Sequence, residues 1–387
     1  MNDKQLLELQ SDRIEMVLNT HKSPARVTGG VVTPRAVQFN LAPALGTKVN
    51  RVQSLAEELA LALGVSSVRV SRQGGSVQLE IPRDDARPVK LLSLMAQLMS
   101  GLHATPGSQT SGDGAPHPTT PSRRIPLATA VLGLCDDGRP LLLRLPSPDV
   151  AHVLIAGCAG SGKTTLCQAM ILSLAIMHRR SQLQFVLVDP KQRAFTPFAP
   201  LPHLLRPIIG DAAEAIVALH ELVKVMEIRG AGSSPDATPR IVVVLDELAD
   251  LVQVGGRALA EPLTRLAQRG REAGIHIIAC TQKPSAQMLG TLVRANFPAR
   301  LVGKVVSPED ARVAAGIGGT GAEKLSGRGD FIAVAAGQVL RFQAAYVSAA
   351  EMDQVVAQFG SVPRRWDVLK GRPSLLHQAA ALVAKAG

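Results

Sequence analysis

A phosphate-binding pattern near the middle of the chain constrains its fold more than any other feature. Residues Gly157 to Thr164 read GCAGSGKT, which fits G-x-x-x-x-G-K-[ST]. The apolar run from His152 to Ala156 predicts a buried strand before this loop, and residues 165–177 predict a helix after it. A loop between a strand and a helix N-terminus presents backbone N–H groups to an anion. The pattern therefore predicts a nucleotide-binding α/β domain.

Each residue type in this loop has a physical role in binding a nucleoside triphosphate. Glycine lets the backbone curl so that successive N–H groups point at one anion. The Lys163 ammonium group can reach the β- and γ-phosphates, and the Thr164 hydroxyl can bind Mg²⁺. We therefore expect ATP and Mg²⁺ as cofactors. The predicted nucleotide-binding residues are Gly157, Cys158, Ala159, Gly160, Ser161, Gly162, Lys163, Thr164 and Thr165.

Four short apolar segments predict the sheet that carries the loop. They read VLIAG, FVLVD, IVVVLDE and IHIIACTQ, and all are rich in β-branched side chains. Stretches of helical periodicity separate them, which is typical of a parallel sheet covered by helices on both faces. The predicted fold class is α/β, with a mainly parallel sheet and a small additional α+β domain at the N-terminus.

Composition divides the chain into four segments. Residues 1–102 predict the small α+β domain, and residues 103–124 predict a linker because they are dense in Gly, Pro, Ser and Thr. Residues 125–360 contain the phosphate loop and predict the nucleotide-binding α/β domain, and residues 361–387 form a basic tail. The chain has 387 residues, of which 46% are hydrophobic, so both domains can bury a core.

The charge balance restricts the class of partner. A net charge of +11 and a pI of about 10.0 favour a polyanion, although a merely basic protein is the alternative that charge alone leaves open. Aromatic residues make up only 3%, so nucleic-acid binding through base stacking is not expected. No apolar run reaches the ~18 residues of a membrane span, and no signal peptide is recognisable. We expect a cytoplasmic protein without membrane insertion.

Polar residues follow two of the predicted strands. Asp246 and Glu247 end the segment IVVVLDE, and Gln282 ends the segment IHIIACTQ. In phosphate-loop enzymes the first acid holds Mg²⁺, and the second polarises the attacking water as general base. An amide at the end of the next strand can hydrogen-bond the γ-phosphate or that water. For the acidic pair, a strand followed by a helix-capping Asp is the structural alternative.

The order and spacing of several blocks resemble the FtsK/SpoIIIE family of double-stranded DNA translocases. The blocks are HVLIAGCAGSGKTT, LVDPK, IVVVLDELADL, LTRLAQRGREAGIHIIACTQKPS, VRANFPARL and LSGRGDFI. The resemblance covers roughly Ala25 to Val347, where the first part is similar to the α subdomain and the rest to the motor subdomain. It implies a RecA-like P-loop fold and a hexameric ring of identical subunits that moves duplex DNA. The sequence after Gly360 is too short for the family's winged-helix γ subdomain.

The resemblance also implies roles for individual residues. Arg271 stands where the family places its arginine finger, a group that completes the ATP site of the neighbouring subunit. An exposed helix arginine is the alternative at this position. Gln282 would sense the γ-phosphate. The predicted catalytic residues are Lys163, Glu247, Arg271 and Gln282, and the predicted metal-binding residues are Thr164 and Asp246.

Basic residues that match the family's pore loops are the candidates for contact with double-stranded DNA. They are Lys283, Arg294 and Arg312, and each of them could equally be a solvated surface charge. Contacts with DNA phosphates would be independent of base sequence and sensitive to salt. Pro308 stands where many members carry a pore-loop lysine, which weakens the assignment in that loop.

Two other functions remain compatible with these motifs. Related ring ATPases couple conjugation or drive protein secretion, so the cargo could differ. A DNA-binding replication or partition factor could use ATP only as an assembly switch. The intact pair Asp246-Glu247 argues against a pure switch, which often lacks the general base.

Overall fold

The structure is a computed structural model that describes residues 3–32, 36–65, 67–73, 76–83, 88–103, 125–230, 238–282 and 296–360. These residues form two compact units: the first comprises Met1–Pro88 together with Asp136–Gly138, and the second comprises the other described residues from Val89 on. The basic tail and the linker beyond His103 lie outside the described residues. Within the described ranges, no helix combines the length and the apolar character that a membrane crossing requires.

The N-terminal unit is an antiparallel sheet covered by helices. Its sheet has the order β1-β2-β4-β3. Buried side chains of Leu18, Phe39, Leu59 and Leu79 form the centre of its core. The elements are α1 (Asp3–Thr20), β1 (Ala25–Val32), β2 (Ala36–Pro43), α2 (Val49–Ser54), α3 (Ala56–Leu63), β3 (Arg69–Gln73) and β4 (Ser76–Pro82). The predicted small α+β fold is confirmed for this unit.

The second unit is built on one large mixed sheet, in the order β7-β6-β14-β13-β12-β8-β11-β10-β9. Five adjacent strands run parallel: β12 (Ala299–Val302), β8 (Val153–Ala156), β11 (Ile275–Thr281), β10 (Arg240–Leu245) and β9 (Leu183–Val188). The remaining strands run antiparallel: β13 (Asp330–Ala335), β14 (Gln338–Tyr346), β6 (Thr129–Cys135) and β7 (Pro140–Arg144). The predicted parallel arrangement therefore describes the half that carries the phosphate loop.

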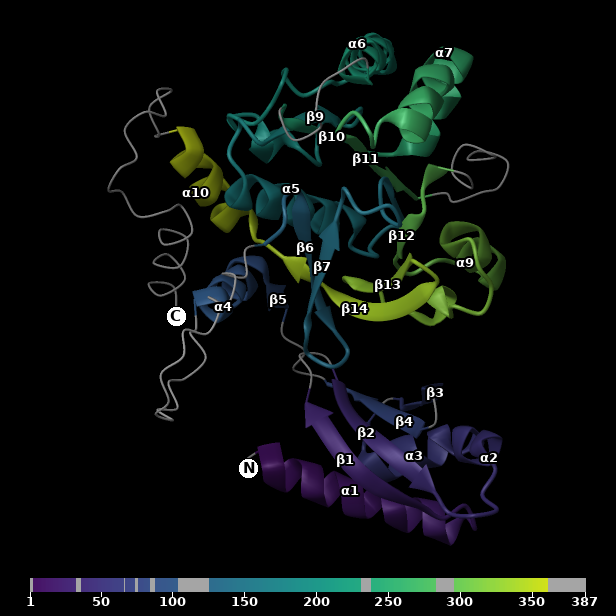
Figure 1. Cartoon of the computed structure of the whole chain (residues 1–387). Helices are drawn as coiled ribbons and strands as arrows, with labels where there is room; N and C mark the ends of the chain where they lie inside the picture. The colour runs from purple at the N-terminus through teal and green to yellow at the C-terminus, as the bar shows by residue number, and fades with distance from the viewer. Residues whose placement is uncertain are drawn as a thin grey trace, which may run out of the picture. The chain divides into compact units, whose positions relative to one another are not determined.

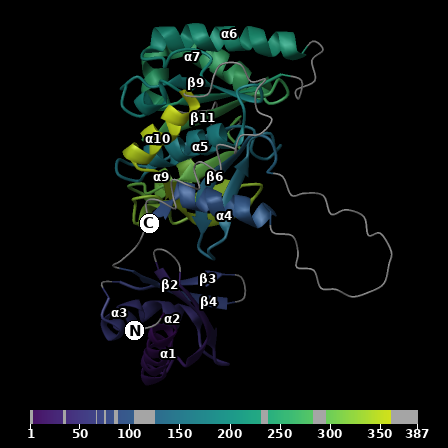
Figure 2. The same ribbon diagram turned by 90° about the vertical axis from the view of Figure 1, so that its left-hand side faces the viewer.

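Helices cover both faces of the parallel strands (Figures 1 and 2). On one face α5 (Lys163–Met177), α4 (Leu91–His103) and α10 (Ala349–Gly360) contribute to one core cluster. On the other face α6 (Ala212–Gly230) and α7 (Leu248–Arg269) pack over a second cluster. The short helix α9 (Pro308–Ala315) and the 3₁₀ turns η1 (Thr196–Phe198) and η2 (Ala322–Lys324) complete the unit. The predicted α/β architecture with a helix-covered sheet is confirmed.

The boundary between the units differs from the division after residue 102 that composition suggests. Strand β5 (Val89–Lys90) pairs in parallel with β14, and the helix α4 that follows it shares the core of the second unit. Leu91 and Leu94 are buried in that core. Residues 89–103 therefore belong to the large unit, because their apolar face is covered by β6, α5 and β14, which come later in the chain.

Candidate active site

The phosphate loop joins the carboxyl end of β8 to the amino end of α5, as the sequence predicts. The backbone is left-handed at Gly160 (φ +76°) and Gly162 (φ +100°), a conformation that glycine adopts without steric cost. A Cβ atom on Gly162 would lie 2.8 Å from the backbone nitrogen of Gly329. The loop is thus packed tightly against a distant segment of the same unit.

Lys163 places a buried cation at this loop. Its side chain is only 8% exposed, and its Nζ donates hydrogen bonds to the carbonyl oxygens of Gly157 at 2.7 Å and Cys158 at 3.0 Å. Burial lowers the pKa of the Lys163 ammonium, and the nearby Cys280 and Glu247 partly oppose that shift. A buried ammonium group with neutral partners gains from a bound anion, which fits the phosphate of a nucleotide.

Hydroxyl groups complete a donor set that fits a magnesium nucleotide. The Oγ of Ser161 is buried and has no hydrogen-bond partner among the described residues. Thr164 is exposed in the first turn of α5, and Thr165 is half-buried beside it. In the described ranges, no three His, Cys, Asp or Glu side chains are grouped to cage a metal. Mg²⁺ bound to a nucleotide usually takes few protein ligands and completes its coordination with phosphates and water.

Asp246 follows β10 at the same edge of the sheet. Its backbone N–H donates to the carbonyl oxygen of Val188 at 2.9 Å, which fixes it beside the end of β9. Burial raises the pKa of the Asp246 carboxyl to about 6, and the charges of Asp189 and Glu247 add to the rise. A cation near Asp246 would lower that pKa again by favouring the charged form. Asp246 therefore has the electrostatic environment of a metal-binding carboxylate.

Glu247 is buried and held in an unusual backbone conformation. Its φ is +56°, in the left-handed region that non-glycine residues rarely occupy. Its Oε1 accepts hydrogen bonds from the Thr281 hydroxyl at 3.2 Å and from the backbone N–H of Gln282 at 3.0 Å. Although Glu247 precedes α7, its side chain does not cap that helix. The carboxylate is thus tied to the end of β11, where the predicted sensor Gln282 begins the next segment.

Arg271 lies far from the phosphate loop of its own chain. It sits in the turn after α7 with its side chain exposed, and its Nε donates to the carbonyl oxygen of Pro146 at 3.3 Å. This turn precedes the amino end of β11, whereas Lys163 and Glu247 lie at the carboxyl ends of the parallel strands. Strand β11 has seven residues, which span ~20 Å. Arg271 is therefore not brought together with the other predicted catalytic residues of this chain.

The predicted DNA contacts are only partly described. Arg312 lies on α9 with its side chain 55% exposed, and its guanidinium forms a bidentate ion pair with Glu309 at 2.6 and 3.0 Å. Its charge is therefore shared with an acidic neighbour. Lys283 and Arg294 lie outside the described residues.

The turn at Arg328 and Gly329 packs against the phosphate loop. No sequence motif assigned this turn to the site. The backbone N–H of Arg328 donates to the carbonyl oxygen of Gly160 at 3.0 Å, and the N–H of Gly329 donates to that of Ser161 at 2.8 Å. Arg328 has a φ of +52°, so this contact is made at the cost of a rarely populated backbone conformation. The two glycines of LSGRGDFI predict a turn, but the sequence does not indicate that this turn contacts the phosphate loop.

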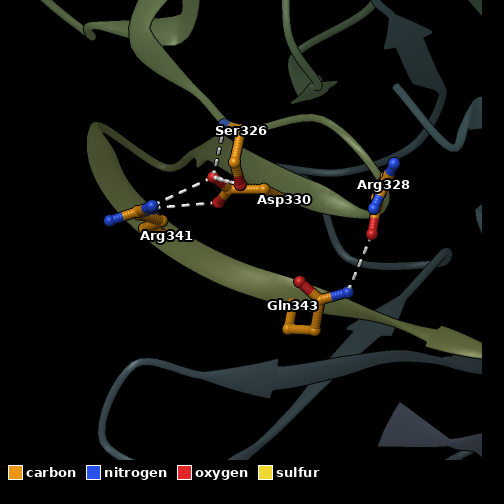
Figure 3. A network of polar contacts seen from close by, with 5 residues as sticks. All are labelled: Ser326, Arg328, Asp330, Arg341 and Gln343. Carbon is orange, nitrogen blue, oxygen red and sulfur yellow. Dashed lines mark hydrogen bonds and ion pairs between the residues drawn. The ribbon is translucent and has the colours of Figure 1, made fainter. Parts of the chain in front are cut away.

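An ion pair ties the end of this turn to strand β14 (Figure 3). Both carboxylate oxygens of Asp330 accept hydrogen bonds from the Arg341 guanidinium, each at 2.9 Å. Asp330 also accepts from the backbone N–H and the hydroxyl of Ser326 at 3.0 and 2.9 Å. The Gln343 amide donates to the carbonyl oxygen of Arg328 at 3.1 Å. Strand β14 thus anchors the turn that contacts the phosphate loop.

Comparison with known proteins agrees with this geometry. The sequence profile of the FtsK/SpoIIIE family matches residues 126–233 and 228–286, and that of the FtsK alpha domain matches residues 1–83. The DNA translocase FtsK of Sporosarcina ureae is 31% identical over 382 residues, covering 91% of this chain and 46% of that protein. The chain belongs to the FtsK/SpoIIIE family. The resemblance seen in the sequence is therefore confirmed.

Other FtsK/SpoIIIE relatives and solved structures extend this result. The DNA translocase SftA of Bacillus subtilis is 29% identical over 420 residues, covering 99% of this chain and 42% of SftA. The chain thus spans less than half the length of these relatives. Among solved structures, the conjugation coupling protein TcpA of pCW3 shares the fold, with a TM-score of 0.58, 16% identity, and coverage of 90% of this chain and 99% of TcpA. The cytoplasmic domain of the secretion ATPase EccC of Thermomonospora curvata has a TM-score of 0.51, 26% identity, and coverage of 62% and 32%.

Proposed function

We propose that the chain hydrolyses ATP with Mg²⁺ and uses the energy to move double-stranded DNA. The observation that carries this proposal is the arrangement at one sheet edge of a glycine-curled loop, a buried Lys163 and the acidic pair Asp246-Glu247. Lys163 and the loop N–H groups would bind the phosphates, and Thr164 and Asp246 would hold Mg²⁺. The metal would supply charge neutralisation at the phosphates. Glu247 would accept a proton from the attacking water, while its link to Gln282 couples the site to the segment after β11.

The place of Arg271 supports a site shared between subunits. Arg271 lies near the amino ends of the parallel strands and Lys163 near their carboxyl ends, so Arg271 cannot complete the site of its own chain. It is exposed, so it can complete the site of a neighbour. We propose that identical subunits assemble into a ring, and that the ring is a hexamer, as the family resemblance implies. Hydrolysis would then depend on assembly, because the arginine stabilises the transition-state charge only across an interface.

The proposed cargo is duplex DNA, held through its phosphates. The net charge of +11 favours a polyanion, and the two relatives described above carry the name DNA translocase. The proposed contacts are Lys283, Arg294 and Arg312. Because Arg312 is paired with Glu309, we expect it to contribute less than an unpaired arginine would. ATP and Mg²⁺ are abundant in the cytoplasm, where we place this motor.

Steady-state ATP hydrolysis, measured with and without long linear duplex DNA, tests this function. Salt and protein concentration are varied together. We expect turnover that DNA stimulates, that falls with salt, and that rises cooperatively with protein concentration. The variants Lys163→Ala and Glu247→Gln should lose turnover, whereas Glu261→Gln on α7 serves as a matched control and should keep it.

The alternatives give different results in the same experiment. Turnover that DNA leaves unchanged would favour a protein cargo. DNA binding that requires ATP, without stimulated hydrolysis, would favour an assembly switch. Normal turnover in Lys163→Ala would contradict the proposed site itself.

A further inference from the structure

Asp189 follows β9 at the sheet edge that carries the phosphate loop, and the expected roles of the site do not use it. Its side chain is fully buried. One carboxylate oxygen, Oδ2, accepts hydrogen bonds from the backbone N–H groups of Ala194 at 2.8 Å and Phe195 at 3.0 Å. The other oxygen, Oδ1, is buried and has no hydrogen-bond partner among the described residues. A buried carboxylate oxygen costs free energy unless a donor meets it.

The pairing of β9 with β10 places this oxygen next to the proposed metal site. Val188 is paired with Leu245 in the parallel register, so Asp189 and Asp246 occupy the next position on strands ~4.8 Å apart. Side chains alternate along a strand. Because Val188 and Leu245 pack on the face of α6 and α7, Asp189 and Asp246 project to the opposite face, which α5 covers. The charge of Asp189 is one cause of the raised pKa of Asp246, which agrees with this proximity.

The surroundings indicate which group Oδ1 would meet. The nearby cation Lys191 forms its ion pair with Asp250 at 3.3 Å. Coordination of the metal by Asp189 itself is not required, because Mg²⁺ is usually bound through one or two carboxylates together with phosphates and water. Mg²⁺ keeps several water molecules when it binds a nucleotide, and each of these is a strong hydrogen-bond donor. A metal-bound water can therefore supply the hydrogen-bond donor that the Oδ1 of Asp189 lacks among the described residues.

We propose that Asp189 is a positioning residue of the Mg²⁺–nucleotide site, where its Oδ1 accepts a hydrogen bond from a water molecule bound to the metal. This inference rests on the proposed function, because it takes Thr164 and Asp246 as the residues that hold Mg²⁺. The competing explanation is that Asp189 only orders the turn at residues 194–195. The two explanations differ in what they predict for the dependence of nucleotide binding on Mg²⁺.

Binding of the slowly hydrolysed analogue ATPγS, titrated against Mg²⁺ and repeated in EDTA, distinguishes them. Asp189→Asn keeps the shape of the side chain and an acceptor for the two N–H groups, but it removes the charge. We expect it to raise the Mg²⁺ concentration for half-maximal binding about tenfold, as does the loss of other groups that hydrogen-bond to metal ligands. Affinity in EDTA should stay unchanged or rise, because a negative charge near the triphosphate is lost. Asp353→Asn, exposed on α10 and far from the phosphate loop in the sequence, is the matched control and should behave like the unaltered protein.

Each outcome decides between the explanations. An unchanged Mg²⁺ dependence in a folded Asp189→Asn protein would overturn the inference. So would an equal loss of affinity in EDTA and in Mg²⁺, because that indicates a purely structural role. Asp189→Ser, which keeps an acceptor hydroxyl, repeats the test if the first variant does not fold. Lys163→Ala distinguishes a failure of the proposed function from a failure of the inference about Asp189. Normal ATPγS binding by Lys163→Ala would contradict the proposed function. If Lys163→Ala loses ATPγS binding while Asp189→Asn behaves like the unaltered protein, only the role of Asp189 is contradicted.

Discussion

Asp330 and Arg341 form a bidentate ion pair, with 2.9 Å between each carboxylate oxygen and its guanidinium nitrogen. The Asp330 side chain is 4% exposed and that of Arg341 is 22% exposed, so the pair is largely removed from water. Since this pair ties strand β14 to the end of the turn whose backbone contacts Gly160 and Ser161, it links that strand to the conformation of the phosphate loop. Burial of the pair makes the loss of one partner costly.

We predict that Asp330→Asn lowers the free energy of unfolding by ~3 kcal/mol, because it leaves the Arg341 guanidinium without its charged partner. Urea denaturation measures this change. Arg312→Gln is the matched control: it breaks a bidentate pair with Glu309 on the surface, and we expect no measurable loss. Equal effects of the two substitutions would contradict a special role for the buried pair. ATPγS affinity should fall in Asp330→Asn and remain normal in Arg312→Gln.

Two glycines of the phosphate loop should respond differently to alanine. Gly160 has a φ of +76° but open space around a Cβ atom, so Gly160→Ala should cost only the backbone strain of ~1 kcal/mol. Gly162 has a φ of +100° and a Cβ atom would lie 2.8 Å from the Gly329 nitrogen, so Gly162→Ala should cost ~2–4 kcal/mol. Urea denaturation of both variants gives the comparison. A similar cost at both positions would show that the turn yields to the added methyl group.

Arg271→Ala should leave nucleotide binding unchanged and lower the rate of ATP hydrolysis by about 10³-fold, because the arginine acts on a neighbouring site. Arg269→Ala, exposed in the last turn of α7, is the control and should hydrolyse ATP normally. The decisive measurement is a mixture of Arg271→Ala with Lys163→Ala. Each variant alone should be inactive, and the mixture should regain turnover, since a Lys163→Ala subunit supplies the arginine to an intact neighbouring site. A mixture that stays inactive would argue against a shared site.

The raised pKa of Asp246 predicts a dependence of stability on pH. The folded value of about 6 lies above the value of ~3.9 expected for an unfolded chain, so the folded protein binds more protons between these pH values. This contribution to stability is present at low pH and is lost as pH rises through about 6. With allowance for solvent screening, Asp246→Asn should therefore raise the free energy of unfolding at pH 8 in EDTA by ~1–2 kcal/mol.

The same comparison at pH 4 supplies the control for this prediction. Asp246 is protonated there, so Asp246→Asn should have almost no effect on urea denaturation. An equal effect at both pH values would mean that the substitution acts through packing and not through charge. With saturating Mg²⁺ and ATPγS at pH 8, the unaltered protein should be more stable than Asp246→Asn, because only its charged carboxylate can bind the metal.

Local patterns in the chain were sufficient to predict the strand, the loop and the helix that make up the phosphate-binding pattern. The phosphate loop is contiguous, and the strand before it and the helix after it follow from apolar runs of the correct length. Glu247 and Gln282 were each expected at the end of an apolar strand, and the structure pairs these two strands in parallel. The sequence also indicates the family, since several blocks recur in one order. Each of these features depends on residues that are close together along the chain.

Contacts between distant segments were decided only by the tertiary structure. The Arg328 backbone reaches the Gly160 carbonyl group across more than 160 residues, and helix α4 joins the large unit by packing beside β14. The buried Oδ1 of Asp189 became recognisable only once β9 and β10 were paired in register. Local propensity predicts that a turn or a strand forms, but it does not predict which buried surface that element packs on or which group it hydrogen-bonds. That choice is made by burial and hydrogen bonding over the whole unit, which is why no sequence pattern predicted the segments that support the phosphate loop.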